Sequence, residues 1–566
     1  MNQQPICRAW ELWKNPILLR YCRSRLRPTA VFVSCLLTVM VTGFLFQMIR
    51  VVSGQKANFS AIDIERTALL PLLFVQGLIL FILGTAQASG GMTAERDEGV
   101  IDYQRLLPMT PAAKVLGYLF GLPIREYLMF FCSMPFTLWC LWKGEVPSHT
   151  WLSLYGVMAS TTLLYHLTGL LTGTIVKNRR WAFLTSIGLI FALYTVIPQA
   201  AKFGLVFFKY LTITPVVEES MRYLMPGTAG SAWETGRRLL SDAKFFNLDF
   251  SEAVFTYFSQ SCLIITFFVM LCRRWKDAEA HLLGKVWAVG FYTWVQVLLL
   301  GNALPLIDSG KLFPTQQFSR FAYLLKGKAW EPASWEALSM ILVYGIISLL
   351  LLWVLSSIVT PSFGTQINGW RRAHKRNRTS IPILADESNS TGFVFLMALI
   401  GGVGWFGFAH VIVESRWFPG QSAPLGLAGH FILAMVTCAM LHQLLLEAKG
   451  GRAVFLGFIF VLVLPLMIAS ILFGASEKFL AIATWIAGIS PLCLPALTAA
   501  HHLGIANLPL NLSRAVPGAH LFWQTVHGLM VLFLITNLWE TRRQTRKQAS
   551  TIGIGTGSRS KGDSAV

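Results

Sequence analysis

The sequence predicts an all-α, polytopic integral membrane protein with about twelve transmembrane helices. Three observations favour this fold class. Of the 566 residues, 54% are hydrophobic and only 13% are charged, and the mean hydropathy is +0.57. Soluble globular domains carry about 25% charged residues. Apolar stretches long enough to cross a bilayer also recur along the chain, and a water-soluble globule is therefore excluded.

Twelve apolar stretches are long enough to span. A bilayer core of about 30 Å requires about 20 apolar residues in helical form, because lipid offers the backbone no hydrogen-bond partners. A thirteenth stretch, 479–499, is interrupted by Gly488, Pro491 and Pro495, and we expect it to be re-entrant; the alternative is a thirteenth span. The twelve are 29–49, 67–86, 119–142, 151–176, 181–198, 253–272, 286–304, 337–359, 392–413, 424–446, 453–473 and 516–538.

The net charge of +20, from 47 Lys and Arg against 27 Asp and Glu, gives the orientation. In a soluble chain such an excess would suggest nucleic-acid binding. Here the basic residues concentrate in alternate loops, which the positive-inside rule places in the cytoplasm. We therefore expect cytoplasmic N and C termini, with the positive charge facing anionic membrane lipids and cytosolic partners and no nucleic acid.

The two ends of the chain are basic. Residues 539–566 are also Gly/Ser-rich, and we expect them to be disordered. Residues 1–28 contain a short amphipathic helix capped by Asn15 with Pro16 at its first position. This helix is expected at the cytoplasmic membrane interface; a basic flank that only enforces topology is the alternative. Its apolar face holds Ile17, Leu18, Tyr21, Cys22 and Leu26, and its basic face Arg20, Arg23 and Arg27.

The spans fall into two six-helix halves, 29–280 and 281–538. A large inside loop follows the second span of each half, and a broken apolar segment precedes each last span. Residue-level similarity between the halves is faint, so the repeat rests on spacing. Such repeats place a translocation route between the halves, by analogy with transporters. The loops are 87–118 and 360–391, and the broken segments lie in 199–252 and at 479–499.

The chemistry of an enzyme or a metal site is absent from the sequence. Nine cysteines form no CxxC pair and lie mostly in or beside apolar runs, as buried hydrophobic residues do. No Gly-x-x-x-x-Gly-Lys-Ser/Thr run is present to hold ATP phosphates. His501 and His502 project about 100° apart on a helix, without a nearby carboxylate or cysteine, and we expect no metal there. An integral membrane enzyme is therefore the third choice of function.

An ion-coupled secondary transporter with twelve spans is the main alternative function. Such carriers keep ionisable groups deep in the membrane. This chain has few: Arg125 and Glu126, which we expect to pair near the interface, and three histidines. His166, His430 and His442 are each expected to bond to a neighbouring helix.

The loop 87–118 carries the most informative pattern, GGMTAERDEGVIDYQRLLPMTPAAKVLGYLFG. Thr93 is expected to cap a helix whose first turn is acidic. Gly99 interrupts this helix, and Val100, Tyr103 and Leu107 are expected on one apolar face. A short helix of this kind suits the docking of a partner.

The alternative interpretation of this loop is an ordinary charged segment. Its acidic residues would then do no more than pair with Arg96 and Arg105.

This loop resembles that of the membrane (permease) subunit of type-2 ABC transporters, in which a Glu-Arg-x-x-Gly run precedes an acidic residue, Leu-Leu and Ser/Thr-Pro. The Leu-Leu and Thr-Pro pairs arrive a few residues later than usual, and Val100 replaces a small hydroxyl residue. With NPILLRYCRSRLRP and RRWKDAE, the resemblance covers about residues 10–280; over the second half it is topological only. The matching residues are Glu95, Arg96, Gly99, Ile101, Asp102, Leu106, Leu107, Thr110 and Pro111.

The resemblance implies that residues 94–111 form a coupling helix docked on a separate cytosolic ABC ATPase, which alone binds ATP and Mg²⁺. This chain would be the export permease in the cell (inner) membrane of a prokaryote, not an enzyme and without a cofactor of its own. One chain would form the pore as a pseudo-dimer, or two chains as a homodimer. The docking residues would be Glu95, Arg96, Asp97, Glu98, Gly99, Ile101, Asp102, Leu106 and Leu107.

The loop 360–391 holds a basic cluster. We expect it to anchor anionic lipid, and it is the second candidate cytosolic contact if the two halves are equivalent. Its residues are Arg371, Arg372, Lys375, Arg376 and Arg378.

Overall fold

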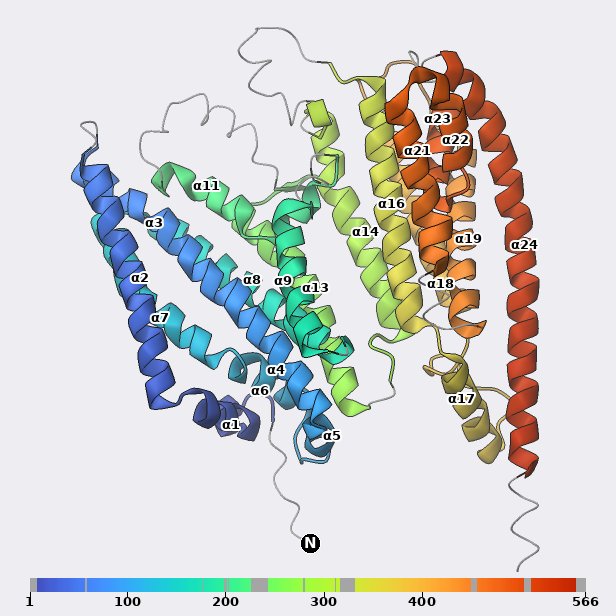
Figure 1. Cartoon of the computed structure of the whole chain (residues 1–566). Helices are drawn as coiled ribbons and strands as arrows, with labels where there is room; N and C mark the ends of the chain where they lie inside the picture. Colours follow the sequence, from blue (N-terminus) through green and yellow to red (C-terminus); the bar gives the residue numbers. More distant parts are fainter. Residues whose placement is uncertain are drawn as a thin grey trace, which may run out of the picture. The chain divides into compact units, whose positions relative to one another are not determined.

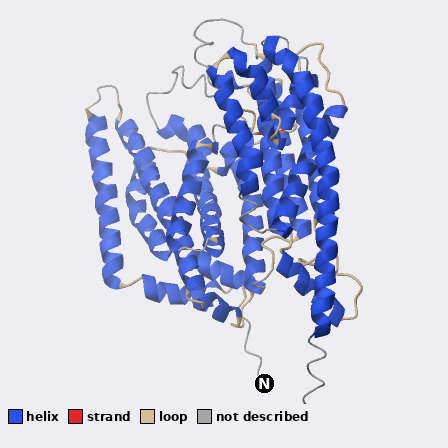
Figure 2. Cartoon of the chain, turned by 45° about the vertical axis from the view of Figure 1, so that its right-hand side comes forward, coloured by secondary structure: helices blue, strands red, loops and turns tan. Residues whose placement is uncertain are grey.

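Helices make up almost all the regular structure of the computed structural model (Figure 2). Among the described residues, the only strands are β1 (Lys244–Phe245) and β2 (Leu248–Asp249), which pair antiparallel with Lys244 opposite Asp249. The structure describes residues 8–55, 59–176, 178–197, 201, 203–224, 243–277, 280–310, 312–315, 331–448, 456–502 and 510–555.

The chain divides into two compact units. The first takes its described residues from Met1–Ala201 and Val206–Ala280. The second takes them from Lys202–Leu205, His281–Ser319 and Lys328–Val566.

The first unit begins with the short helices η1 and α1 and ends with the span α13. In Figure 1, α1, α5 and α6 lie at the same end of this unit. Its elements are η1 (Leu12–Lys14), α1 (Pro16–Arg25), α2 (Pro28–Gly54), α3 (Ala61–Gly77), the π-helix η2 (Leu78–Gly84), α4 (Thr85–Asp97), α5 (Val100–Arg105), α6 (Pro111–Gly121), α7 (Ile124–Lys143), α8 (Ser148–Ile175), α9 (Arg179–Thr195), η3 (Val206–Leu211), α11 (Thr214–Leu224), the two strands and α13 (Glu252–Lys276).

The second unit begins with α14 and ends with α24, the longest helix among the described residues. Because α24 continues to Gly555, the expectation of disorder is wrong for residues 539–555, and residues 556–566 lie outside the described residues. In Figure 1, α17 lies beside the C-terminal part of α24, against which it packs. Its elements are α14 (Lys285–Ile307), α16 (Ser334–Val359), α17 (Phe363–Lys375), α18 (Thr391–Val413), α19 (Gly426–Ala448), the π-helix η4 (Phe458–Val463), α21 (Leu464–Ala475), η5 (Glu477–Phe479), α22 (Leu480–Ala487), η6 (Pro491–Cys493), α23 (Leu494–His502) and α24 (Leu510–Gly555).

The all-helical, multi-pass membrane fold is confirmed. Eight helices in the described chain are long and apolar enough to cross a bilayer, or ten if each of two bent helix pairs is one span. Helices also cover the other predicted stretches, but α8, α9 and the η4–α21 segment are more polar or shorter than a full span. The number of twelve spans and the side on which the termini lie stay predictions.

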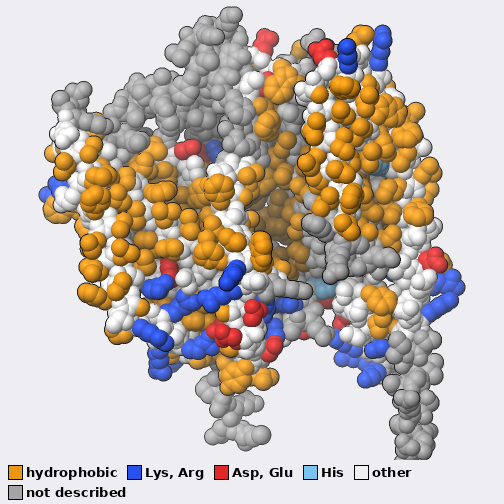
Figure 3. All heavy atoms as spheres, in the orientation of Figure 1, with side chains coloured by type: hydrophobic (Ala, Val, Ile, Leu, Met, Phe, Trp, Pro, Cys, Tyr) orange, Lys and Arg blue, Asp and Glu red, His pale blue; other side chains and the backbone are white. Residues whose placement is uncertain are grey.

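The surface of the spans fits a lipid environment. Only 17% of the apolar window of α2, and the same share for α24, is buried within the protein. In Figure 3, hydrophobic side chains cover the first unit over α2, while Lys and Arg gather at the end that carries α1 and α5. Apolar flanks with charged ends are the pattern that a bilayer core of about 30 Å requires.

The stretch 479–499 does not run as one straight helix. The segments Glu477–Ala487 and Pro491–His502 meet at an angle of 113°. At the break, a Cβ atom on Gly488 would lie only 2.0 Å from Cδ1 of Trp523, so the close approach of α24 requires glycine there. The interruption that Gly488 and Pro491 predict is therefore present, whereas a re-entrant path through the membrane stays a prediction.

The polar groups within the helices of the first unit are largely paired as predicted. His166 bonds to the Leu80 carbonyl through Nε2 (2.9 Å) and to the Tyr127 hydroxyl through Nδ1 (2.7 Å). Leu80 belongs to the π-helix η2, and π-helical turns shift the backbone hydrogen-bond pattern. Arg125 Nη2 lies 3.1 Å from Glu126 Oε1, which confirms that pair.

In the second unit the predicted pairing holds for one histidine and fails for another. His442 Nε2 bonds to the Ser357 hydroxyl of α16, as expected. His430 Nδ1 is buried and has no hydrogen-bond partner among the described residues. Instead, its ring lies beside those of His502 and His520, because α19, α23 and α24 pack together.

Candidate functional site

The predicted coupling segment begins inside a long helix. The run from α3 through η2 to α4 is continuous over Ala61–Asp97, 37 residues, so no helix begins at Thr93. The Thr93 hydroxyl donates instead to the Ser89 carbonyl one turn earlier (3.0 Å), as a threonine in mid-helix does. The prediction that Thr93 is a helix cap is therefore wrong. A cap that was not predicted lies at Thr110, before α6: its hydroxyl accepts from the Ala113 amide (3.2 Å).

Gly99 makes the turn between α4 and α5. Its φ of +72° is in the left-handed region, which glycine adopts without the steric cost of a Cβ atom. This turn decides which face of α5 points inward. Ile101 is buried against the apolar cluster that contains Met109 and Leu119, and Leu107 packs against the same cluster.

Two large apolar side chains of this segment point outward. Tyr103 is 68% exposed and Leu106 is 82% exposed. The predicted apolar face of Val100, Tyr103 and Leu107 is therefore wrong, because the turn at Gly99 sets a rotation of α5 that periodicity alone does not give.

Three exposed acidic residues precede the two exposed apolar side chains in the sequence. Asp97, Glu98 and Asp102 are exposed, and the Asp102 side chain retains 78% of its accessible surface. We call the set Asp97, Glu98, Asp102, Tyr103 and Leu106 the α5 tip.

Both basic residues of the segment pair with this tip. Arg96 Nη2 lies 2.7 Å from Asp97 Oδ1, and Arg105 pairs with Asp102. The interpretation of this loop as an ordinary charged segment predicts the same two ion pairs. The paired acidic side chains nevertheless stay exposed to solvent, so the α5 tip remains accessible to a partner.

Glu95, by contrast, points into the protein and is 9% exposed. Three donors converge on its carboxylate. Oε1 accepts from Arg20 and from the Tyr21 hydroxyl (2.7 Å), and Oε2 accepts from the Tyr118 hydroxyl (3.1 Å). The Tyr118 hydroxyl also lies 2.5 Å from Gln104 Oε1 of α5. Glu95 thus joins α4 to α1, α5 and α6 through one hydrogen-bonded network.

The network has a fixed protonation pattern at its α1 end. Burial, together with the negative charge of Glu95, raises the pKa of the Tyr21 phenol well above its usual value. Tyr21 therefore stays protonated and donates to the carboxylate. Sequence patterns did not identify this network, because Arg20 and Tyr21 are more than 70 residues from Glu95 and no short motif connects them.

Helix α1 is held on α6 at close range. The Asn15 Oδ1 caps α1 by accepting from the amides of Ile17 (3.0 Å) and Leu18 (3.4 Å), as predicted, and its Nδ2 donates to the Ala113 carbonyl (2.6 Å). A Cβ atom on Gly117 would lie 2.7 Å from Asn15 Oδ1, so glycine permits this approach. The base of the site is therefore a packed assembly of α1, α4 and α6.

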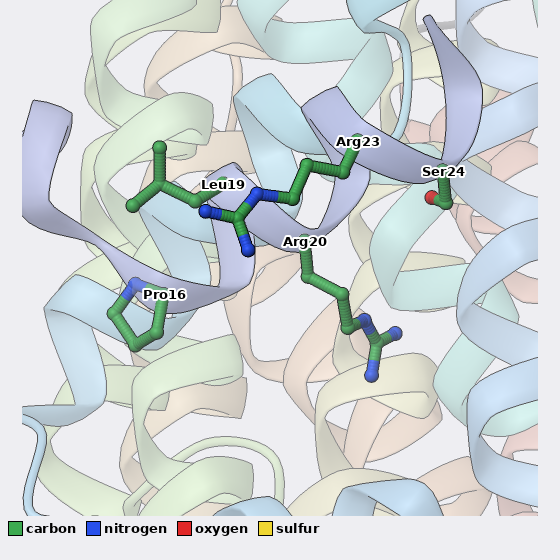
Figure 4. A pocket seen from close by; sticks show the side chains of 5 residues that line it. All are labelled: Pro16, Leu19, Arg20, Arg23 and Ser24. Atoms are coloured by element: carbon green, nitrogen blue, oxygen red, sulfur yellow. The ribbon is translucent and has the colours of Figure 1, made fainter. Parts of the chain in front are cut away.

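The outer side of α1 is open. Arg23 extends alongside exposed Leu19, whereas Arg20, which pairs with Glu95, extends in a different direction (Figure 4). A guanidinium group next to an apolar side chain suits an anionic membrane surface, where the segment 1–28 is predicted to lie. The groove measures about 470 Å³ and is lined by Pro16, Leu19, Arg20, Arg23 and Ser24.

A second, smaller cavity lies between α5 and the end of α13. It measures about 200 Å³ and has Arg96, Arg105 and Arg274 on its wall. Arg105 Nη2 donates to the Arg274 carbonyl (3.3 Å), and Trp275 stacks on Tyr118 with ring centroids 5.2 Å apart. The end of α13 therefore supports the same base.

The basic cluster of the second unit lies on and after α17. Arg371 is half-buried and Arg372 pairs with Glu387 (2.8 Å), whereas Lys375, Arg376 and Arg378 are exposed. No large apolar side chain among the described residues of α17 is exposed as fully as Leu106. The cluster therefore differs in chemistry from the α5 tip.

The structure thus divides the nine predicted docking residues into two groups. Asp97, Glu98, Gly99, Asp102 and Leu106 are exposed. Glu95, Arg96, Ile101 and Leu107 are buried or half-buried and hold the segment in place. No protein-family model, curated protein or solved structure matches this chain.

Proposed function

We propose that this chain is the permease subunit of an ATP-driven export system and is moved by a separate cytosolic ABC ATPase. The observation that carries the proposal is the α5 tip, an exposed apolar and acidic surface on a rigid base. Isolated exposed apolar residues are common, but Tyr103 and Leu106 are only three residues apart and follow the exposed Asp97, Glu98 and Asp102 directly after a long apolar helix. Aromatic anchors of this kind dominate the energetics of protein interfaces.

The base explains how docking would act on the membrane helices. The α5 tip is tied to α4 through the short turn at Gly99, and α4 is tied to α1 and α6 through Glu95. A force on the tip would therefore move these helices as one body. In this proposal the free energy comes from the ATPase, and the permease supplies an element with two arrangements.

The experiment that tests the docking surface uses the purified chain and the cytosolic ABC ATPases purified from the same organism. We expect Tyr103→Ala/Leu106→Ala to reduce recovery of the ATPase at least about tenfold, since interface anchors each contribute about 2 kcal/mol or more. The matched control is Phe246→Ala/Leu248→Ala, which removes two side chains that are 44% and 60% exposed in the segment 199–252, which is predicted to lie on the outside. Equal recovery with both double variants would exclude the tip as the docking surface.

One observation favours the ion-coupled transporter as a second candidate. Glu126 is 1% exposed, and its Oε2 has no hydrogen-bond partner among the described residues. Buried carboxylates in membrane proteins often belong to ion pathways. If the chain alone in liposomes sustains uphill flux from an ion gradient, and Glu126→Gln abolishes it, this second function replaces the first.

A further inference from the structure

Three histidines from three helices meet in the second unit. His430 lies near the start of α19, His502 ends α23, and His520 is on α24. One ligand nitrogen from each lies within 4.8 Å of the other two. The ring centroids are 5.2 to 5.6 Å apart. A fourth ring, that of His501, stacks on His520 at 4.6 Å.

The nitrogens of this cluster lack partners. His430 Nδ1, His502 Nε2 and His520 Nε2 are buried, and none has a hydrogen bond to another described residue. A buried polar atom left in this state costs about 1–3 kcal/mol. Isolated histidines of the spans are bonded to neighbouring helices through both ring nitrogens (His166) or through one (His442, whose Nδ1 has no partner among the described residues). What distinguishes the cluster is that three rings, each with an unpaired nitrogen, lie together, and this indicates a missing ligand.

We propose that His430, His502 and His520 bind one divalent transition-metal ion, with Zn²⁺ as the best fit. Imidazole nitrogen is a preferred ligand of Zn²⁺, Ni²⁺ and Cu²⁺, whereas Mg²⁺ and Ca²⁺ require oxygen ligands, which this set does not supply. His501 or water completes the four-coordinate site.

The geometry needs only a small adjustment. Tetrahedral zinc with Zn–N distances of 2.0–2.1 Å holds its ligand nitrogens about 3.4 Å apart. The three nitrogens already lie within 4.8 Å, and His430 and His502 are partly exposed, so rotation of their rings can close the remaining distance. His520 is 4% exposed and forms the buried side of the site.

The proposed site differs from the sequence-based expectation for His501 and His502. Their adjacency on one helix makes a poor site, but α19 and α24 each add a ligand that sequence spacing does not reveal. Bound metal would join the end of α23, the second arm of the bent 479–499 region, to two of the long helices. Metal binding would thus stabilise a segment that its own Gly and Pro residues weaken.

The test is metal binding by the full-length chain, purified in detergent without a polyhistidine tag and stripped with a chelator. Titration with Zn²⁺ by calorimetry is expected to show one tight site per chain. Co²⁺ in the same site is expected to give the intense visible absorption of tetrahedral coordination. His520→Ala is expected to weaken binding at least about 100-fold, since loss of even an outer-shell partner costs 10–100-fold.

Two further variants make the outcome decisive. His430→Gln changes a partly exposed ligand near the start of a helix and replaces His520→Ala in the test if that variant does not fold. It is expected to weaken Zn²⁺ binding by a similar factor. His410→Ala is the matched control, because His410 pairs with Glu414 (3.0 Å) outside the cluster and offers a surface site. Absence of a one-equivalent site, or loss of binding in His410→Ala with retention in His430→Gln, would overturn the proposal.

Discussion

Removal of the Glu95 side chain tests whether the base of the α5 tip is held as described. In Glu95→Ala, the hydroxyl of Tyr21, a residue that is 5% exposed, loses the only acceptor that it has among the described residues. A hydrogen bond to a charged group contributes about 1.5–3 kcal/mol. Tyr118 keeps Gln104 as a hydrogen-bond partner, and the Arg20 side chain, which is 43% exposed, can bond to water instead. Each of these two residues therefore contributes less than Tyr21 to the free energy that is lost. The total loss is about 3 kcal/mol.

This loss is local and is best measured as hydrogen exchange of peptides from α1 and α5. At 1.4 kcal/mol per factor of ten, exchange through local opening is expected to accelerate about 100-fold in both helices, while peptides from the second unit are unchanged. Tyr21→Phe removes one donor only and is expected to accelerate exchange by about tenfold.

The control for this prediction is Asp102→Ala. It removes an ion pair on the same segment whose carboxylate side chain is 78% exposed, and exposed pairs contribute less than about 1 kcal/mol. If a folded Glu95→Ala protein shows unaltered exchange in α1 and α5, the network does not join these helices and the reasoning is refuted.

Two further changes probe the packing of each unit. Gly117→Val places a Cβ atom 2.7 Å from Asn15 Oδ1, and overpacking of this kind costs about 1–3 kcal/mol, so limited trypsin digestion is expected to cleave α1 faster. Arg542→Ala leaves Glu447, whose side chain is 3% exposed, without its bidentate partner, and an uncompensated buried charge costs about 3–5 kcal/mol, so the temperature of thermal inactivation is expected to fall.

Each of these changes has a matched control. Gly188→Val adds the same side chain where a Cβ atom meets nothing within 4 Å, and cleavage of α1 should not change. Arg543→Ala removes the neighbouring cation, which contacts only the ring of Trp539 in the described structure, and the inactivation temperature should move little. If Gly188→Val accelerates cleavage of α1 as much as Gly117→Val does, the packing argument is contradicted. If Arg543→Ala lowers the inactivation temperature as much as Arg542→Ala does, the buried-charge argument is contradicted.

Features that depend on neighbouring residues could be predicted from the sequence. The apolar stretches all contain helices, the Asn15 cap is present, and Arg125 pairs with the adjacent Glu126. Each of these depends on a pattern within a few residues: apolar length, a cap before a proline, or adjacent opposite charges. Interruption of 479–499 at Gly488 belongs to the same class.

Features that depend on packing between distant helices could not be predicted from the sequence. Thr93 resembled a cap because acidic residues follow it, but the continuous helix from α3 to α4 leaves no free amides there. The buried position of Glu95 and the outward position of Leu106 follow from α1 and from the turn at Gly99. The histidine cluster likewise needs α19, α23 and α24 to meet.

The length of α24 has a consequence for how motion could be observed. Its 46 residues correspond to about 69 Å at 1.5 Å per residue, more than twice the thickness of a bilayer core. About 25 Å of it follows the apolar stretch that ends at residue 538. A fluorescent reporter fused to this rod would amplify small tilts of the helix within the bilayer into large displacements above the membrane surface.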